Sequence, residues 1–203
     1  VGIGQQVVVV GHQRDAVEAA VAADDVDFVL QDRQLGTGHA VQVTAGAVRG
    51  DTVVVLCGDA PLVPPALLRT LLERHAASGV ACTAVAAEMP DPTGYGRMLS
   101  NAAGDLERIV EHKDANADQR AIRLINSGIY AFRREDLFRC LAAVRPDNSQ
   151  GEYYLTDVPK LLVAEGARVP MVIAEDPDAV LGVNTPEHLA AAERAYRARA
   201  AGG

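Results

Sequence analysis

The first half of the chain alternates short apolar runs with helical patterns of about ten residues, and this alternation limits the fold more than any other feature. Residues 7–10 are four consecutive valines, which is typical of a strand covered on both faces. The predicted strands lie at residues 7–10, 28–30, 52–56 and 81–86, and the predicted helices at residues 14–23, 39–48 and 64–77. This order predicts βαβ units, and therefore an α/β fold with a mostly parallel sheet.

The second half of the chain has a different pattern. Short apolar runs at residues 98–100 and 106–111 flank a polar turn that contains Gly104, which predicts an antiparallel hairpin. Further strands are expected at residues 126–132 and 169–174, and helices through Leu137 and Leu141, over residues 156–165 and over residues 186–200. We find no internal repeat or linker composition, so residues 1–203 are expected to form one domain in which the hairpin is an excursion from the sheet.

Composition excludes several classes of protein. A chain of 203 residues with 49% hydrophobic residues is long and apolar enough for one globular α/β domain. Its net charge of -8 argues against a nucleic-acid-binding surface, and no apolar run is long enough to cross a membrane. The start of the chain has no signal-peptide pattern, and Cys57, Cys82 and Cys140 form no metal-binding pair. We expect a cytoplasmic protein with buried thiols and no nucleic-acid or membrane partner.

Glycines and glutamines follow the second predicted strand and open the next helix. Gly36 and Gly38 would let backbone N–H groups approach an anionic ligand at a helix start. Gln31 and Gln34 each supply the donor and acceptor needed to read a nucleobase edge. The alternative is a plain turn between a strand and a helix, because two glycines alone are a weak signal.

A carboxylate follows the third predicted strand. Gly58 and Asp59 lie at the carboxyl end of residues 52–56, where α/β sheets bind ligands. The Asp59 carboxylate suits Mg²⁺, which takes oxygen ligands and shares them with phosphates. Asn184 precedes Thr185, the expected N-cap of the last helix. The alternative for both residues is a simple turn.

Three further residues stand near the predicted hairpin. Gly96 and Glu111 flank it, so we expect them to lie side by side, with Gly96 admitting a ligand and Glu111 accepting a hydrogen bond. Asn126 begins an apolar strand, where asparagine is disfavoured unless its amide is used. The alternative for Glu111 is an exposed ion pair with Lys113.

Together these segments resemble the bacterial bifunctional family that acetylates glucosamine 1-phosphate and then uridylylates it. The segments that carry the resemblance are residues 34–40, 58–62, 91–97, 110–115, 126–128 and 150–157. They occur in the family's order, and the resemblance extends over essentially the whole chain. It implies a Rossmann-like nucleotidyltransferase domain that makes UDP-N-acetylglucosamine and pyrophosphate from UTP and N-acetylglucosamine 1-phosphate.

The resemblance also implies roles for matching positions. It implies that the nucleotide contacts Gln31, Gln34, Gly36, Thr37 and Gly58, that Asp59 and Asn184 hold Mg²⁺, and that Gly96, Glu111 and Asn126 bind the sugar. The transfer needs no protein nucleophile, so the absence of a catalytic triad pattern fits it. Cys57 departs from the family, since some of its members have tyrosine there.

Two features of the family find no match in this sequence. The family opens with a strand and a glycine-rich loop that carries an arginine, followed by a lysine, and nothing similar precedes Val7. The hexapeptide repeats of the acetyltransferase domain, through which full-length relatives are expected to form homo-oligomers, are absent as well. We therefore expect an N-terminally truncated domain with poor activity. A nucleotidyltransferase for another sugar 1-phosphate and a non-catalytic fragment are the alternatives.

Overall fold

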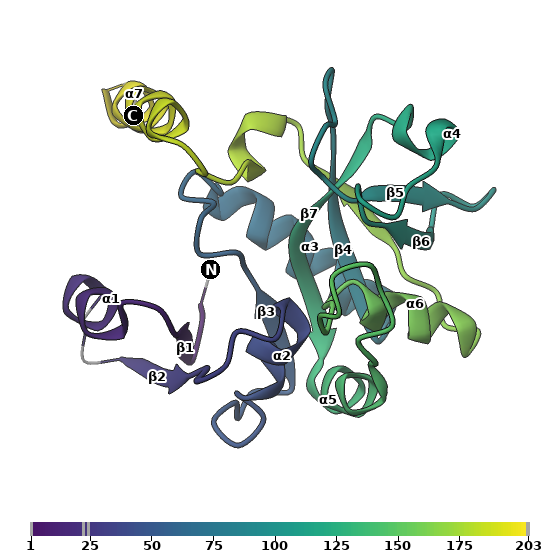
Figure 1. Ribbon diagram of the computed structural model, residues 1–203, viewed down its shortest axis with the longest axis horizontal. Helices are drawn as coiled ribbons and strands as arrows, with labels where there is room; N and C mark the ends of the chain where they lie inside the picture. Colours follow the sequence, from purple (N-terminus) through teal and green to yellow (C-terminus); the bar gives the residue numbers. More distant parts are fainter. Residues whose placement is uncertain (1, 22, 24, 202–203) are drawn as a thin grey trace.

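Two β-sheets and their covering helices form the computed structural model, which describes residues 2–21, 23 and 25–201 (Figure 1). The strands are β1 (Gln6–Val10), β2 (Val26–Leu30), β3 (Thr52–Val55), β4 (Cys82–Glu88), β5 (Arg97–Ser100), β6 (Leu106–Val110), β7 (Leu124–Arg133) and β8 (Met171–Ile173). The helices are α1 (Arg14–Val21), α2 (Thr37–Gln42), α3 (Pro65–Ser78), α4 (Ala117–Arg120), α5 (Arg134–Ala143), α6 (Asp157–Ala164) and α7 (Pro186–Ala201), with a 3₁₀ helix η1 over Pro177–Val180.

The larger sheet is mixed rather than mostly parallel, although the predicted α/β class is confirmed. Its strand order is β6-β5-β7-β4-β8, and β3 also pairs with β7. Strands β3, β4 and β8 run in one direction, but β7 runs antiparallel between β3 and β4. The prediction was wrong on this point because period and length identify a strand without giving its direction. The β5–β6 hairpin is antiparallel as predicted, and it joins the sheet through the pairing of Arg97 with Ile125.

A wide bulge interrupts β7 close to its start. Between the pairings Ala84–Tyr130 and Ala86–Asn126, one residue of β4 stands opposite three residues of β7. Gly128 takes a φ of +76° there, which favours glycine. The Ser127 hydroxyl donates to the Val85 carbonyl over 2.7 Å and accepts from the Ile129 N–H over 3.1 Å, so the bulge leaves these backbone groups paired. Bulges of this kind redirect side chains, and this one lies beside Asn126.

The larger sheet has an apolar cluster on each face. One cluster joins Phe132 to residues of α5 and α6 such as Leu137 and Val158. The other joins Ile129 to Leu71 of α3. Helices therefore cover both faces, as the α/β class requires. Cys82 and Cys140 are buried as expected, but Cys57 is exposed because it follows the end of β3.

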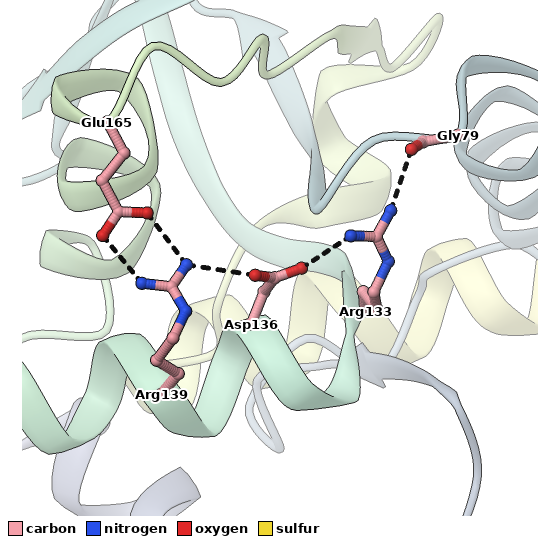
Figure 2. Close-up of polar contacts among 5 residues, drawn as sticks. All are labelled: Gly79, Arg133, Asp136, Arg139 and Glu165. Atoms are coloured by element: carbon pink, nitrogen blue, oxygen red, sulfur yellow. Dashed lines mark hydrogen bonds and ion pairs between the residues drawn. The ribbon is translucent and has the colours of Figure 1, made fainter.

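Charged side chains connect α5 to its neighbours at one end of this sheet (Figure 2). Arg139 binds both carboxylate oxygens of Glu165 over 2.7 and 2.9 Å and reaches Asp136 over 3.0 Å. Arg133 donates to Asp136 and to the Gly79 carbonyl, each over 2.9 Å. Such exposed pairs add little to stability, so they orient α5 more than they stabilise the domain.

The smaller sheet consists of β1 and β2, which pair in parallel with Val8 opposite Phe28. Only Val10 of the four valines is buried, and Val7 to Val9 are half-buried. The predicted cover on both faces is not found because α1 buries none of its residues. Among the described residues, β1 pairs with β2 alone and β3 with β7 alone, so each has one edge without a strand neighbour.

Helix lengths differ from the prediction at two places. Helix α2 covers Thr37–Gln42 rather than residues 39–48, since the Thr44 hydroxyl donates to the Val41 carbonyl over 2.7 Å and competes with helical pairing. Helix α1 ends at Val21, and residue 22 of the predicted helix lies outside the described residues. In the portion of the chain that is described, no helix has the length and apolar character needed to span a bilayer.

The open edges of β1 and β3 generate a prediction about stability. We define the extended chain as residues 1–203 preceded by the opening segment of a member of the family described above. A strand that pairs with both edges would satisfy backbone groups, which cost about 1–3 kcal/mol each when they are buried unpaired. We expect slower amide hydrogen exchange in β1 and β3 of the extended chain. We also expect it to turn over UTP, in the reaction that the resemblance implies, well above the level of residues 1–203 alone.

The control is an extended chain of the same length with prolines in the added strand, since proline cannot donate to a ladder. It should show neither gain. Full activity of residues 1–203 alone, or unchanged exchange in the extended chain, would show that these edges need no further strand.

Candidate functional site

The predicted site residues that flank strands of the larger sheet gather at one of its ends. Asp59 follows β3, Glu111 follows β6 and Gly96 directly precedes β5. Asn126 lies near the start of β7, which reaches the same end because β7 runs antiparallel to β3, with Val55 opposite Tyr130. The direction of β7, which the sequence pattern did not reveal, is therefore what places Asn126 beside residues that follow β3.

The loop before α2 packs against a distant segment. The Gly38 N–H donates to the Tyr153 carbonyl over 2.7 Å, and the Tyr153 N–H donates to the Leu35 carbonyl over 2.8 Å. Gly36 has a φ of +107°, and a Cβ atom placed on it would lie 2.7 Å from the Tyr153 carbonyl oxygen. The Thr37 hydroxyl accepts from the Leu155 N–H over 3.1 Å. Glycine is thus required here by packing within the protein, before any ligand is considered.

Gln31 lies directly after β2 and is only 8% exposed. Its Nε2 donates to the Gly36 carbonyl over 3.1 Å and contacts His39 Nδ1 over 3.0 Å. A carbonyl only accepts, so the group that faces Gly36 is the amide nitrogen, and His39 Nδ1 must then accept the second hydrogen. The protein uses both amide hydrogens, and Gln31 is left with Oε1 as an acceptor for a ligand.

Gln34 is exposed beside Gln31. Its Nε2 donates to the Gln31 carbonyl over 3.3 Å, and a Cβ atom placed on Gly11 would lie 2.5 Å from the same nitrogen. Gln34 lies in the loop in which it was predicted to act, and it packs over the end of β1. Gly58 has no atom within 4 Å of a Cβ position, so the surroundings of this residue do not require glycine.

The two predicted metal ligands lie together. A Cβ atom placed on Gly182 would be 2.5 Å from Asp59 Oδ2 and 3.3 Å from Asn184 Nδ2. The Val183 N–H donates to the Asp59 carbonyl over 2.8 Å, which holds the two segments against each other. Within the described residues, no ion pair involves Asp59. The absence of a side chain at Gly182 therefore brings a free carboxylate close to an amide.

This pair fits a hard cation only as part of a larger set of ligands. A carboxylate and an amide oxygen suit Mg²⁺, which usually keeps water or phosphate oxygens as its other ligands. The part of the chain that is described contains no group of three or more His, Cys, Asp and Glu residues able to hold a metal ion. Asp59 and Asn184 would thus hold such an ion jointly with a bound ligand.

Sequence reasoning assigned no role to Tyr95, although it lies in the segment 91–97. Partial burial raises the pKa of Tyr95, a hydrogen bond with the Gly182 backbone opposes this shift, and the Asp59 charge adds to it. Gly182 and Asp59 are therefore both close enough to the Tyr95 hydroxyl to shift its pKa. Its place between Gly94 and Gly96 was the only signal in the sequence.

The three predicted sugar-binding residues also lie together. A Cβ atom placed on Gly96 would be 3.3 Å from Glu111 Oε2 and 3.6 Å from Asn126 Cβ. The Asn126 N–H donates to the Gly96 carbonyl over 2.9 Å. Lys113 contacts Gln150, and the ion pairs of the described residues do not include one between Glu111 and Lys113. The alternative prediction, an exposed ion pair of Glu111 with Lys113, is therefore wrong.

Glu111 sits in an environment that disfavours its charge. Burial raises the pKa of the Glu111 carboxyl, and the charges of Asp114 and Asp157 raise it further. The Thr156 hydroxyl, which donates to Glu111 Oε1 over 2.9 Å, acts in the opposite direction. Glu111 Oε2, the oxygen near Gly96, is left for a ligand. A donor bound there would offset part of the cost of the buried charge.

Cys57 connects the two halves of the site. A Cβ atom placed on Gly128 would lie 2.5 Å from Cys57 Sγ, and Cys57 is two residues from Asp59. Neighbouring protein atoms desolvate the sulfur of this exposed residue and raise the pKa of the Cys57 thiol, and the charge of Asp59 adds to the effect. The carboxylate half around Asp59 and the polar half around Asn126 are therefore neighbours in one site.

A separate cavity of about 350 Å³ lies elsewhere. It is lined by Asp51, Thr52, His75, Ala76, Gly79, Val80, Arg133, Arg134 and Glu135. These residues lie where β3 begins and β7 ends, at the opposite end of the sheet, and none of them is a predicted site residue. The cavity is therefore not part of the site described above.

Curated relatives share substantial sequence identity with this chain. The protein named bifunctional protein GlmU from Desulfotalea psychrophila is 43% identical over 197 residues, which cover 96% of this chain and 58% of the relative. The protein of the same name from Acidovorax sp. is 49% identical over 204 residues, which cover 96% of this chain and 42% of the relative. The chain spans about half the length of the curated relatives it matches.

Solved structures show the same fold at low sequence identity. A UDP-glucose pyrophosphorylase solved with UDP-glucose has a TM-score of 0.76 and 16% identity, over 96% of this chain and 81% of that one. A CMP:2-keto-3-deoxy-manno-octonic acid synthetase solved with CTP has a TM-score of 0.68 and 20% identity, over 98% and 83%. The nucleotidyltransferase fold expected from the sequence is thus confirmed.

A family model described as the MobA-like NTP transferase domain matches residues 1–128. These residues carry Asp59, Gly96, Glu111 and Asn126, which the structure gathers at one end of its larger sheet, and Gln31, which follows β2 of the smaller sheet. The chain belongs to the family of MobA-like NTP transferase domains.

Proposed function

We propose that this chain transfers a uridylyl group from UTP to N-acetylglucosamine 1-phosphate, giving UDP-N-acetylglucosamine and pyrophosphate for cell-wall precursor synthesis. The observation that carries the proposal is that two polar pairs lie in one place: Asp59 with Asn184, and Glu111 with Asn126. Cys57, two residues from Asp59, packs against Gly128, two residues from Asn126. The relatives named GlmU, which match nearly the whole chain, support the same reaction.

The reaction is an in-line displacement. A phosphate oxygen of the sugar phosphate forms a bond to the α-phosphorus of UTP, and the bond from that phosphorus to the pyrophosphate oxygen breaks. No proton has to pass through a protein nucleophile, so the protein acts by positioning the substrates and stabilising charge. Bound Mg²⁺, held by Asp59 and Asn184, would neutralise negative charge on the phosphates.

The polar side chains of the site can divide the recognition of the substrates. Gln31 retains only Oε1 for a ligand, and an acceptor matches the N3–H of uracil better than the unprotonated N3 of cytosine. Glu111 Oε2 accepts from the sugar, and Asn126 borders the same position at Gly96.

The remaining parts of the proposal concern the setting of the reaction. We infer a cytoplasmic location because UTP is made and used there. Mg²⁺ is the proposed ion since its oxygen preference fits the Asp59 and Asn184 side chains. Homo-oligomerisation through a further domain remains a prediction for the longer relatives.

Replacing the proposed metal ligand tests the phosphate half of the site. Asp59→Asn in the extended chain should lower turnover by about 100-fold or more, because it removes the only charge of the pair that would hold Mg²⁺. Turnover is measured as pyrophosphate release at saturating Mg²⁺. Asp118→Asn, which changes an exposed aspartate on α4, is the control and should keep full turnover. Near-normal turnover of Asp59→Asn would remove Asp59 from the site.

Replacing the sugar-facing residues tests the other half. Glu111→Ala and Asn126→Ala should each raise the KM for N-acetylglucosamine 1-phosphate by about tenfold, which corresponds to one lost hydrogen bond to a polar or charged group. The KM for UTP should change by less than about twofold, on the same scale. Glu107→Ala, at an exposed position of β6, is the matched control. An equal rise in both KM values would indicate damage to the fold.

A further inference from the structure

We propose that Tyr130 is a positioning residue that fixes the amide of Asn126, so that Asn126 presents only its NH₂ group to the sugar phosphate. The inference rests on the proposed function, because it names a residue that acts on the sugar through Asn126. Tyr130 was not among the residues singled out from the sequence, and its side chain is fully buried.

The orientation of the Asn126 amide follows from its neighbours. The Gly128 N–H lies 3.2 Å from one amide atom of Asn126, and a backbone N–H only donates, so that atom is Oδ1. The Tyr130 hydroxyl lies 2.6 Å from the same oxygen and therefore donates to it. An amide oxygen has two lone pairs, and both are now used. Reversing the amide would place NH₂ against the Gly128 N–H.

Tyr130 is held firmly enough to impose this orientation. Its ring packs on Phe132 with the ring centroids 5.3 Å apart, and it belongs to the apolar cluster that faces α5 and α6. Its backbone is paired with Val55 on one side and Ala84 on the other. Burial raises the pKa of Tyr130 well above its usual range, so the hydroxyl keeps its proton and remains a donor.

The other end of the Asn126 amide is open. Within the described residues Nδ2 has no hydrogen-bond partner, and it is not one of the buried atoms that lack one. It therefore faces accessible space as a pure donor, and Asn126 Cβ and Glu111 Oε2 both border the position where Gly96 has no side chain. The Asn126 NH₂ group donates, and the Glu111 carboxylate accepts. An acetamido group or a pair of hydroxyl groups on the ligand offers the complementary acceptor and donor.

The bulge in β7 makes this contact possible. Residues 127–129 stand opposite a single residue of β4, which brings the side chains of Asn126 and Tyr130 within hydrogen-bond distance. The hydroxyl of Tyr130 is not needed to fill the core, since the ring alone makes the apolar contacts. Tyr130→Phe thus removes the restraint on Asn126 and leaves the packing intact.

The experiment compares Tyr130→Phe with the parent in the extended chain. We expect the KM for N-acetylglucosamine 1-phosphate to rise about three- to tenfold, the equivalent of one hydrogen bond, while the KM for UTP and the kcat change less than about twofold. Thr83→Val is the control, since it removes another buried hydroxyl, which contacts His75 Nδ1 over 3.1 Å at the opposite end of the sheet. It should leave the KM for the sugar phosphate unchanged.

A double-mutant cycle separates positioning from a general loss of stability. In the Asn126→Ala background, Tyr130→Phe should change the KM for the sugar phosphate by less than about twofold, because no amide remains to be oriented. An additive effect in that background, or equal changes in both KM values, would overturn the role of Tyr130. A parent chain that uses UTP but not N-acetylglucosamine 1-phosphate would instead overturn the proposed function, and the role of Tyr130 with it.

Discussion

The bulged, antiparallel β7 is the constraint on which the rest of the site depends. Because β7 runs against β3 and β4, its first residues reach the end of the sheet where β3 stops. The Ser127 hydroxyl pairs the backbone groups that the bulge would otherwise leave open, so the distortion carries little cost. A regular strand at this place would bring neither Gly128 against Cys57 nor the Tyr130 hydroxyl against Asn126.

A common arrangement recurs among the polar side chains of the site. Gln31, Glu111 and Asn126 each have one half of the side chain fixed by the protein and the other half left for a ligand. His39 and the Gly36 carbonyl fix Gln31. Thr156 fixes Glu111. Tyr130 and the Gly128 N–H fix Asn126. Groups held in this way need no reorganisation when a ligand binds, which is the usual source of electrostatic stabilisation in enzymes. The site is therefore preorganised by hydrogen bonds from three different segments.

The loop before α2 shows how packing and recognition share residues. Gly36 and Gly38 were expected to admit a ligand, but their backbones pack against Tyr153 first. The same segment reaches Glu111 through Thr156. The proposed nucleotide loop and the proposed sugar-binding carboxylate of Glu111 are thus attached to one stretch of chain, so a disturbance at residues 153–156 would reach both.

The sequence by itself determined the order of strands and helices, the α/β class, the β5–β6 hairpin and the identity of the polar residues that the fold gathers at one end. These follow from local periodicity, turn residues and unusual positions such as Asn126 in an apolar strand. Only the tertiary structure decided the direction of β7, the length of α2, the exposure of Cys57 and the surroundings of the Tyr95 and Tyr130 side chains. The reason is physical. Strand direction and amide orientation depend on hydrogen-bond partners that are far away in the chain, and local sequence patterns do not identify those partners.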